Sequence, residues 1–226
     1  MRIDIWSDVV CPWCYVGKRR LETALAQFPH PVEVVWHSFE LDPSAPAERT
    51  GGYVDHLAAK YGRSLAEAQG MLDAMTETAA VEGLDFRFDL ARGGSTFDAH
   101  RLLHLAAAKG LQGELKERLL RATFTEGEPI GHPEVLTRLA VSVGLEEAEV
   151  SWVLSGEAYA DAVRQDEAEA RRLGISGVPF FVVDGRYGVS GAQPAEVLLQ
   201  VLEQGADQHS AEQHAGASCD DESCTV

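Results

Sequence analysis

The pattern of hydrophobic and polar positions predicts strands at the start of the chain. Residues 2–10 alternate between apolar and polar side chains and are rich in β-branched and aromatic types, which is typical of a strand. Residues 15–28 predict a helix that stops before a proline, because proline cannot continue a helical hydrogen-bond ladder. Residues 32–39 alternate again and predict a second strand.

The middle of the chain has a different pattern. From about residue 53 to about residue 154, Ala, Leu, Glu and Arg recur at spacings of three and four, with short glycine-containing breaks between the runs. This spacing places apolar side chains on one face of a helix, so it predicts a block of several helices. A further helix is predicted over residues 157–173.

The last third of the chain predicts a hairpin, a helix and a tail. In residues 174–191 an apolar run, an Asp-Gly turn and a second short strand follow one another, as in a β-hairpin. Residues 194–204 predict a closing helix. Residues 205–226 are polar, acidic and almost without apolar anchors, so we expect a mobile tail there.

This order of elements predicts an α/β fold with a mixed central sheet flanked by helices. A strand–helix–strand half joined to a hairpin–helix half suits one sheet, and the helical block lies between the halves as an inserted all-helical domain. We therefore expect residues 1–50 and 155–204 to form one domain, residues 51–154 to form the insertion and residues 205–226 to form the acidic tail.

The amino-acid composition argues against some classes of binding partner. The chain of 226 residues has 36 Asp plus Glu against 19 Lys plus Arg, a formal net charge of −17. Such a surface repels phosphate, which argues against nucleic acid or an anionic membrane as partner. The sequence has no apolar run long enough for a secretory leader or a membrane span. We therefore predict a cytoplasmic protein, where paired cysteines are more often catalytic or metal-binding than structural.

The candidate chemistry lies in the motif Cys11-Pro12-Trp13-Cys14, which follows the first predicted strand at the opening of a helix. Pro12 suits the first helical position, and Cys11 would then face unpaired backbone N–H groups that favour a thiolate. Cys14, one turn later, is placed to resolve a mixed disulfide formed at Cys11. Zinc would need two further ligands, so we expect no metal here.

Three segments together resemble the thioredoxin-fold superfamily, and within it the DsbA-like family with a helical insertion, in its cytoplasmic FrnE-type branch. The segments are residues 7–17 around the cysteine motif, residues 96–102 in the helical block and residues 174–181 before the hairpin. The resemblance extends to about Gln204. It implies a thioredoxin-like fold and a thiol–disulfide oxidoreductase that oxidises, reduces or isomerises protein disulfides.

The resemblance also implies roles for individual residues. Pro179 would form a cis peptide bond beside the cysteines, and the backbone of Val178 would pair with an extended substrate segment. Trp13 would add to the substrate-binding surface. His100 and Arg101 become candidates for lining the cleft, although such residues are more often structural.

Two other functions remain open. Related 2-hydroxychromene-2-carboxylate isomerases and kappa-class glutathione transferases use glutathione, and they typically carry Ser where this chain has Cys11. Having both Cys11 and Cys14 favours dithiol exchange, with glutathione still possible as a thiol substrate and no bound cofactor required. A redox-sensing binding or chaperone protein is the other alternative. Expected partners are protein or small-molecule thiols and disulfides, with monomer and homodimer both open.

A second cysteine pair, Cys219 and Cys224, lies in the predicted tail. A tethered pair could exchange electrons with the first pair. Alternatively, His209, His214, Cys219 and Cys224 supply four ligands suited to a metal. The third interpretation is an unordered tail with incidental thiols.

Overall fold

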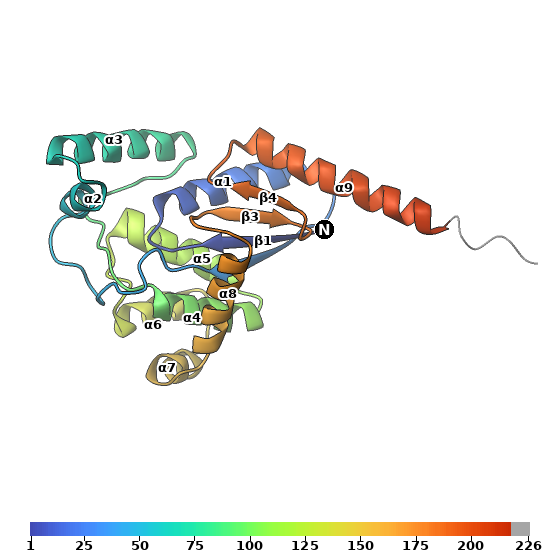
Figure 1. Ribbon diagram of the computed structural model, residues 1–226. Helices are drawn as coiled ribbons and strands as arrows, with labels where there is room; N and C mark the ends of the chain where they lie inside the picture. Colours follow the sequence, from blue (N-terminus) through green and yellow to red (C-terminus); the bar gives the residue numbers. More distant parts are fainter. Residues whose placement is uncertain (218–226) are drawn as a thin grey trace, which may run out of the picture.

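A computed structural model of the chain describes residues 1–217 and contains one four-stranded sheet (Figure 1). The strand order is β2-β1-β3-β4; β1 and β2 run parallel, and the other two neighbouring pairs run antiparallel. The mixed sheet predicted from the sequence is therefore confirmed. The strands are β1 (Arg2–Ser7), β2 (Glu33–Ser38), β3 (Phe180–Val183) and β4 (Tyr187–Ser190).

Helices make up the rest of the regular structure, and the predicted helical block is present between β2 and β3. A short π-helical segment, η1 (Ala122–Glu126), continues one of its helices. No helix in the described part of the chain has the length and apolar character needed to cross a membrane. The helices are α1 (Pro12–Gln27), α2 (Tyr53–Tyr61), α3 (Leu65–Val81), α4 (Phe97–Ala108), α5 (Gln112–Arg121), α6 (Pro133–Ser142), α7 (Glu147–Ser155), α8 (Ala160–Arg172) and α9 (Ala195–Ala217).

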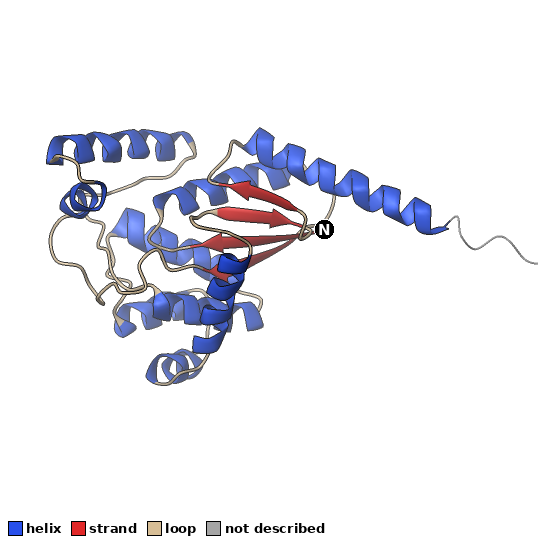
Figure 2. Cartoon of the chain, in the orientation of Figure 1, coloured by secondary structure: helices blue, strands red, loops and turns tan. Residues whose placement is uncertain are grey.

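The sheet is packed between helices on both faces (Figure 2). Because side chains alternate along a strand, Ile3 and Ile5 of β1 point to one face, where they pack with Leu198 and Leu202 of α9. Trp6 points to the other face and packs with Ala170 and Ile175 at the end of α8. Helix α1 joins the first layer, so the helix that carries the cysteine motif lies on the sheet beside α9.

Helix α5 closes the outer edge of β2 with one side chain. Gln112 Oε1 accepts the backbone N–H of Trp36 at 3.1 Å, and Gln112 Nε2 donates to the carbonyl of Trp36 at 2.8 Å. The amide thus makes the two hydrogen bonds that a neighbouring strand would make at this position. This contact fixes the start of α5 against the sheet.

The loop after β2 is held by glycines of the insertion. A side chain on Gly94 or Gly131 would place its Cβ within 2.2 or 1.9 Å of the Ala47 carbonyl oxygen, so only glycine fits at both positions. The N–H of Arg49 also donates to the Gly93 carbonyl at 2.8 Å. The glycines therefore fix the path of a loop that forms one wall of the candidate site.

A network of ion pairs and hydrogen bonds joins β1 and β2 to α8. His37 of β2 lies between Asp4 of β1 and Asp166 of α8, with 2.7 Å between each ring nitrogen and the nearest carboxylate oxygen. Asp166 also accepts the N–H of Ser38 at 2.7 Å and lies 3.1 Å from His104. Burial lowers the pKa of His37, but its hydrogen bonds to the two carboxylates outweigh this and raise that pKa overall.

Two boundaries differ from the sequence prediction. The first strand ends at Ser7 because the chain turns at Asp8 into α1, whereas we expected it to reach Val10. Helix α9 continues to Ala217, whereas we expected the closing helix to end at residue 204; the added stretch is rich in the helix formers Ala, Glu and Gln. The proposed division of the chain into domains remains a prediction.

Candidate active site

The two cysteines of the motif lie where β1 leads into α1. Cys11 is the residue before the helix, Pro12 is its first residue as predicted, and the N–H of Cys14 donates to the Cys11 carbonyl at 3.0 Å. Both side chains are buried free thiols, and Cys11 retains slightly more exposure, 5% against 1%. The first turn carries no acidic residue that would oppose a thiolate.

The loop before β3 packs directly on this helix. The Val178–Pro179 peptide bond is cis, as expected, and the Cys11 thiol donates to the Val178 carbonyl at 3.4 Å. A Cβ on Gly17 would lie 2.9 Å from Pro179 Cγ, so glycine allows α1 to approach the proline closely. The structure thus brings together the cysteine motif and Val178–Pro179, which are far apart in the sequence. Trp13 lies outside this contact and is 46% exposed.

The two cysteines have pKa values that are shifted in opposite directions. The interaction with the Cys14 thiol, together with burial, raises the pKa of Cys11. Burial also raises the pKa of Cys14, but hydrogen bonding from Cys11 and the charge of Lys116 lower it overall. The pKa of Cys14 is thus lowered and that of Cys11 raised, whereas the helix start predicts a lowered pKa for Cys11.

Asp8 joins the cysteine motif to the helical insertion. Its carboxylate is fully buried, accepts the N–H of Leu41 at 2.8 Å and lies 3.3 Å from His100 Nε2. Burial raises the pKa of Asp8, and the hydrogen bond and charge of His100 lower it overall. His100 is thus brought near the site through Asp8, and its other ring nitrogen, Nδ1, is buried without a hydrogen-bond partner in the described structure.

Arg101 does not point toward the cysteines. Its guanidinium donates to the carbonyls of Val153, Gly156 and Ala158 and pairs with Asp98 at 2.8 Å. These contacts tie α4 to the connection between α7 and α8. The suggestion that Arg101 lines the cleft is therefore not supported, and its role is structural.

Sequence reasoning missed Lys116 of α5, which is fully buried and close enough to Cys14 to lower the pKa of that thiol. A signal for it was available in the helical pattern. Lys116 precedes Leu119 and Leu120 by three and four residues, so it falls on the apolar face of its helix. A lysine at such a position has to be paired or functional.

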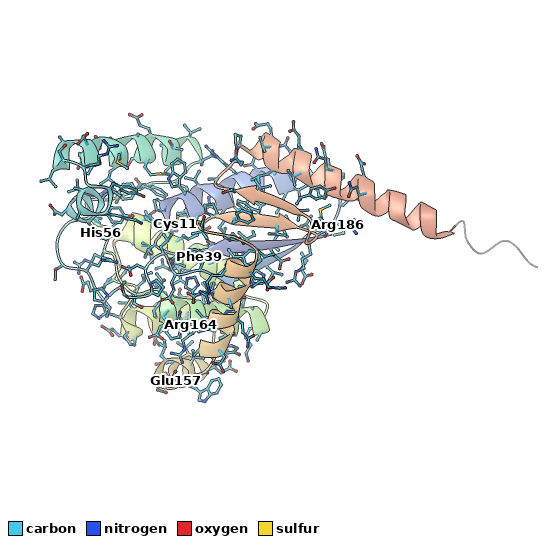
Figure 3. All side chains as sticks on the ribbon, in the orientation of Figure 1. Cys11, Phe39, His56, Glu157, Arg164 and Arg186 are labelled. Atoms are coloured by element: carbon cyan, nitrogen blue, oxygen red, sulfur yellow. The ribbon has the colours of Figure 1, made fainter. Side chains whose placement is uncertain are left out.

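A cavity of about 330 Å³ opens beside Asp8 and Val10. The loop after β2, the start of α2 and the loop before α4 form its walls. Its lining includes the cationic Arg49 and Lys60 and the imidazole of His56, together with Asp8 and with Asp42, which pairs with Arg49; Figure 3 labels His56 and Cys11. Burial, followed by the charges of Arg49 and Lys60, lowers the pKa of His56.

No group of three His, Cys, Asp or Glu side chains suited to a metal occurs within the described residues. Cys219 and Cys224 lie outside these residues, as do the side chains of His209 and His214. The second redox pair and the alternative metal site in the tail therefore remain predictions.

The fold and the site define a thioredoxin-like protein in which a Cys-x-x-Cys pair at a helix start faces a cis-proline. The chain matches the family model described as a DSBA-like thioredoxin domain over residues 2–203, and it belongs to that family. The resemblance noted in the sequence is thereby confirmed.

Two known proteins are similar to this chain in sequence over most of its length. A probable DsbA oxidoreductase from Streptomyces coelicolor is 51% identical, with a TM-score of 0.88 over 92% of this chain and 90% of that chain. The uncharacterized protein YwbO of Bacillus subtilis (strain 168) is 31% identical over 203 residues, which are 89% of this chain and 96% of YwbO.

Two more distant structures share the fold. The cytosolic disulfide reductase DsbM from Pseudomonas aeruginosa, solved with GSH, is 20% identical, with a TM-score of 0.62 over 94% of this chain and 100% of that chain. A 2-hydroxychromene-2-carboxylate isomerase is 15% identical, with a TM-score of 0.62 over 96% of this chain and 100% of that chain.

Proposed function

We propose that the chain catalyses thiol–disulfide exchange in the cytoplasm, with Cys11 as the sulfur that reacts with substrate and Cys14 as the resolving sulfur. The observation that carries the proposal is the hydrogen bond from the Cys11 thiol to the carbonyl of Val178 beside cis-Pro179. This contact places a backbone able to pair with an extended peptide directly beside the more accessible thiol.

In the reducing direction, Cys11 attacks one sulfur of a substrate disulfide. The Cys11 proton passes to Cys14, a new bond forms between Cys11 and the substrate, and the other substrate sulfur leaves as a thiolate. Cys14 then gives its proton to the released substrate thiolate and attacks the sulfur of Cys11. The second substrate thiolate is released and the Cys11–Cys14 disulfide remains.

The cycle needs an external thiol to reduce that disulfide again. In the oxidising direction the same steps run backward, and two electrons pass from a substrate dithiol to the Cys11–Cys14 disulfide. Isomerisation uses the mixed disulfide and returns the pair to the dithiol. Trp13, exposed beside Cys14, offers an apolar contact surface for protein substrates in each case.

The first test is the reduction of insulin by dithiothreitol, followed by turbidity, with wild type, Cys11→Ser and a buffer control. We expect wild-type turnover and a Cys11→Ser rate equal to that of buffer. Cys14→Ser should accumulate a mixed disulfide with the substrate, detectable by mass spectrometry. A wild-type rate equal to buffer would refute general disulfide exchange, and a single exchange without turnover would instead favour the redox-sensing alternative.

A second proposal is that glutathione serves as the external thiol. The observation in its favour is the cavity beside Asp8 and Val10, since Lys60 and Arg49, which also pairs with Asp42, line it and can bind the carboxylates of glutathione. A structural relative was solved with GSH, which supports the same idea. This role requires only transient binding and no resident cofactor.

Lys60→Glu tests the glutathione proposal. Reversing this charge should lower kcat/KM for glutathione by about tenfold, while the rate with uncharged 2-mercaptoethanol changes less. Arg63→Glu is the matched control, because Arg63 is exposed close to Lys60 and does not line the cavity. Equal losses in both variants, or equal losses with both thiols, would contradict specific recognition of glutathione.

A further inference from the structure

Lys116 is a charged side chain that is fully buried. Its ammonium donates to the Ser7 carbonyl at 3.3 Å and lies 5.5 Å from the centre of the Trp36 ring. Among the described residues, no carboxylate oxygen forms an ion pair with it. Removing an ammonium group from water costs free energy unless a nearby anion compensates its charge.

The nearest groups that can become anions are Asp8 and the cysteine pair. Burial lowers the pKa of Lys116 to about 8, and the charges of Cys14, Asp8 and Cys11 oppose that shift. Lys116 therefore still carries its proton at neutral pH in most molecules. Lys116 interacts with both sulfurs, and its charge lowers the pKa of Cys14.

A second unpaired group lies beside the same sulfur. The hydroxyl oxygen of Ser7, the last residue of β1, is buried and makes no hydrogen bond within the described structure. Its position near Cys14 lowers the pKa of that thiol, as does the backbone N–H of Asp8. An uncommitted hydroxyl can turn its proton toward a thiolate without losing another partner.

We propose that Lys116 and Ser7 form a buried site that receives the negative charge of Cys14 when the Cys11–Cys14 disulfide opens. The proposal rests on the proposed dithiol exchange and deepens it. When a thiolate attacks Cys11, the sulfur–sulfur bond breaks and its electron pair goes to Cys14, beside the ammonium and the hydroxyl. The inserted helix α5 thus makes the disulfide easier to reduce.

The rival explanation is purely structural, because Lys116 also binds the end of β1 through the Ser7 carbonyl. The two explanations differ in a measurable way. A structural lysine affects the free energy of unfolding, whereas a charge that stabilises a thiolate shifts the redox equilibrium and its pH dependence.

The test is the equilibrium of the full chain with a mixture of reduced and oxidised glutathione, quenched by alkylation and read by mass. Lys116→Met keeps the length of the side chain and removes the charge, and it should shift the equilibrium toward the disulfide by about tenfold at pH 7. Arg118→Met is the control on the same helix, since Arg118 pairs with Glu126 at 2.8 Å. It should leave the equilibrium constant within about twofold of wild type.

Two further results are expected from a charge effect. In a Cys11→Ala background, the thiolate absorbance of Cys14 should appear at higher pH when Lys116 is replaced by Met. The difference in redox equilibrium between wild type and Lys116→Met should also shrink above about pH 9, where Lys116 loses its own proton.

A folded Lys116→Met protein whose equilibrium constant stays within about twofold of wild type would overturn the proposal. If that variant does not fold, Ser7→Ala decides, because it removes only one oxygen; about a threefold shift toward the disulfide supports the proposal and no shift overturns it. The measurement uses no protein substrate. A wild type that forms the Cys11–Cys14 disulfide but does not reduce insulin would therefore contradict the proposed function alone.

Discussion

Two groups of polar side chains lie at the pair of parallel strands. The middle group, named for Asp4 at the middle of β1, is partly buried, and the end group at the carboxyl end of β1 is fully buried. In the middle group, His37 is bonded to both Asp4 and Asp166, and each partner has further hydrogen bonds. In the end group, Ser7 and His100 each leave a buried polar atom without a hydrogen bond in the described structure. Of the three buried side-chain atoms without a partner among the described residues, two belong to the end group and the third, Glu167 Oε1, lies on α8. Complete pairing is typical of a structural joint, so the two groups are expected to respond differently to substitution.

Breaking the middle group should have the largest effect on stability. Asp166→Asn removes the charge that compensates His37 and an acceptor for the N–H of Ser38, so we expect the free energy of unfolding to fall by about 3 kcal/mol. Urea denaturation measures this. Glu169 lies about one turn after Asp166 on the same helix and is more exposed; Glu169→Gln loses only a surface pair with Arg172 and should cost below about 0.5 kcal/mol. Similar losses in both variants would contradict the comparison.

A smaller effect is expected in how the free energy of unfolding depends on pH, because the middle group contains titratable side chains. The pKa of His37 is raised in the folded protein, so its contribution to stability is complete below the unfolded pKa of about 6.5 and disappears as the pH rises through the folded pKa. The pKa values of Asp4 and Asp166 are lowered, so their contributions disappear in acid instead.

The measurement is the free energy of unfolding of wild type and His37→Asn between pH 6 and pH 9. We expect the advantage of wild type to shrink as the pH rises. Using the difference between the two proteins removes the titration of other groups, including Glu40, whose burial raises its pKa to about 7. A difference that stays constant over this range would show that His37 is neutral in the folded protein.

The smallest change in stability should come from the end group. Ser7→Ala removes a hydroxyl that makes no hydrogen bond, so the free energy of unfolding should stay within about 0.5 kcal/mol of wild type. Thermal and urea denaturation check this. A loss above about 2 kcal/mol would mean that the hydroxyl is paired in the folded protein, and the contrast with the middle group would no longer hold.

Much of the fold follows from local patterns in the sequence. The alternation in β1 and β2, the Asp184-Gly185 turn of the hairpin and Pro12 at the helix start each predict a feature that the structure contains. These signals act over a few residues, so no tertiary information is needed to read them. The cis form of the Val178–Pro179 bond came from the family resemblance, because sequence alone rarely fixes the isomer.

The residues around the sulfurs were harder to predict because they meet only in three dimensions. Lys116 is about a hundred positions from Cys14 in the sequence, and in composition it resembles any surface lysine. Arg101 shows the opposite error, since the family resemblance suggested that it lines the cleft although its guanidinium binds carbonyls at the α7–α8 connection. Successive residues of an α-helix point in directions about 100° apart, so two neighbours in the sequence can face different parts of the molecule.

The amide of Gln112 has a consequence for how the protein behaves at high concentration. An exposed edge strand offers free backbone groups to which a second chain can add, and such addition leads to aggregation. At Trp36 both backbone groups of β2 are already bonded to Gln112, so an incoming strand finds no donor or acceptor at the centre of this edge. One side chain from the insertion thus protects the sheet from growing into a neighbouring molecule.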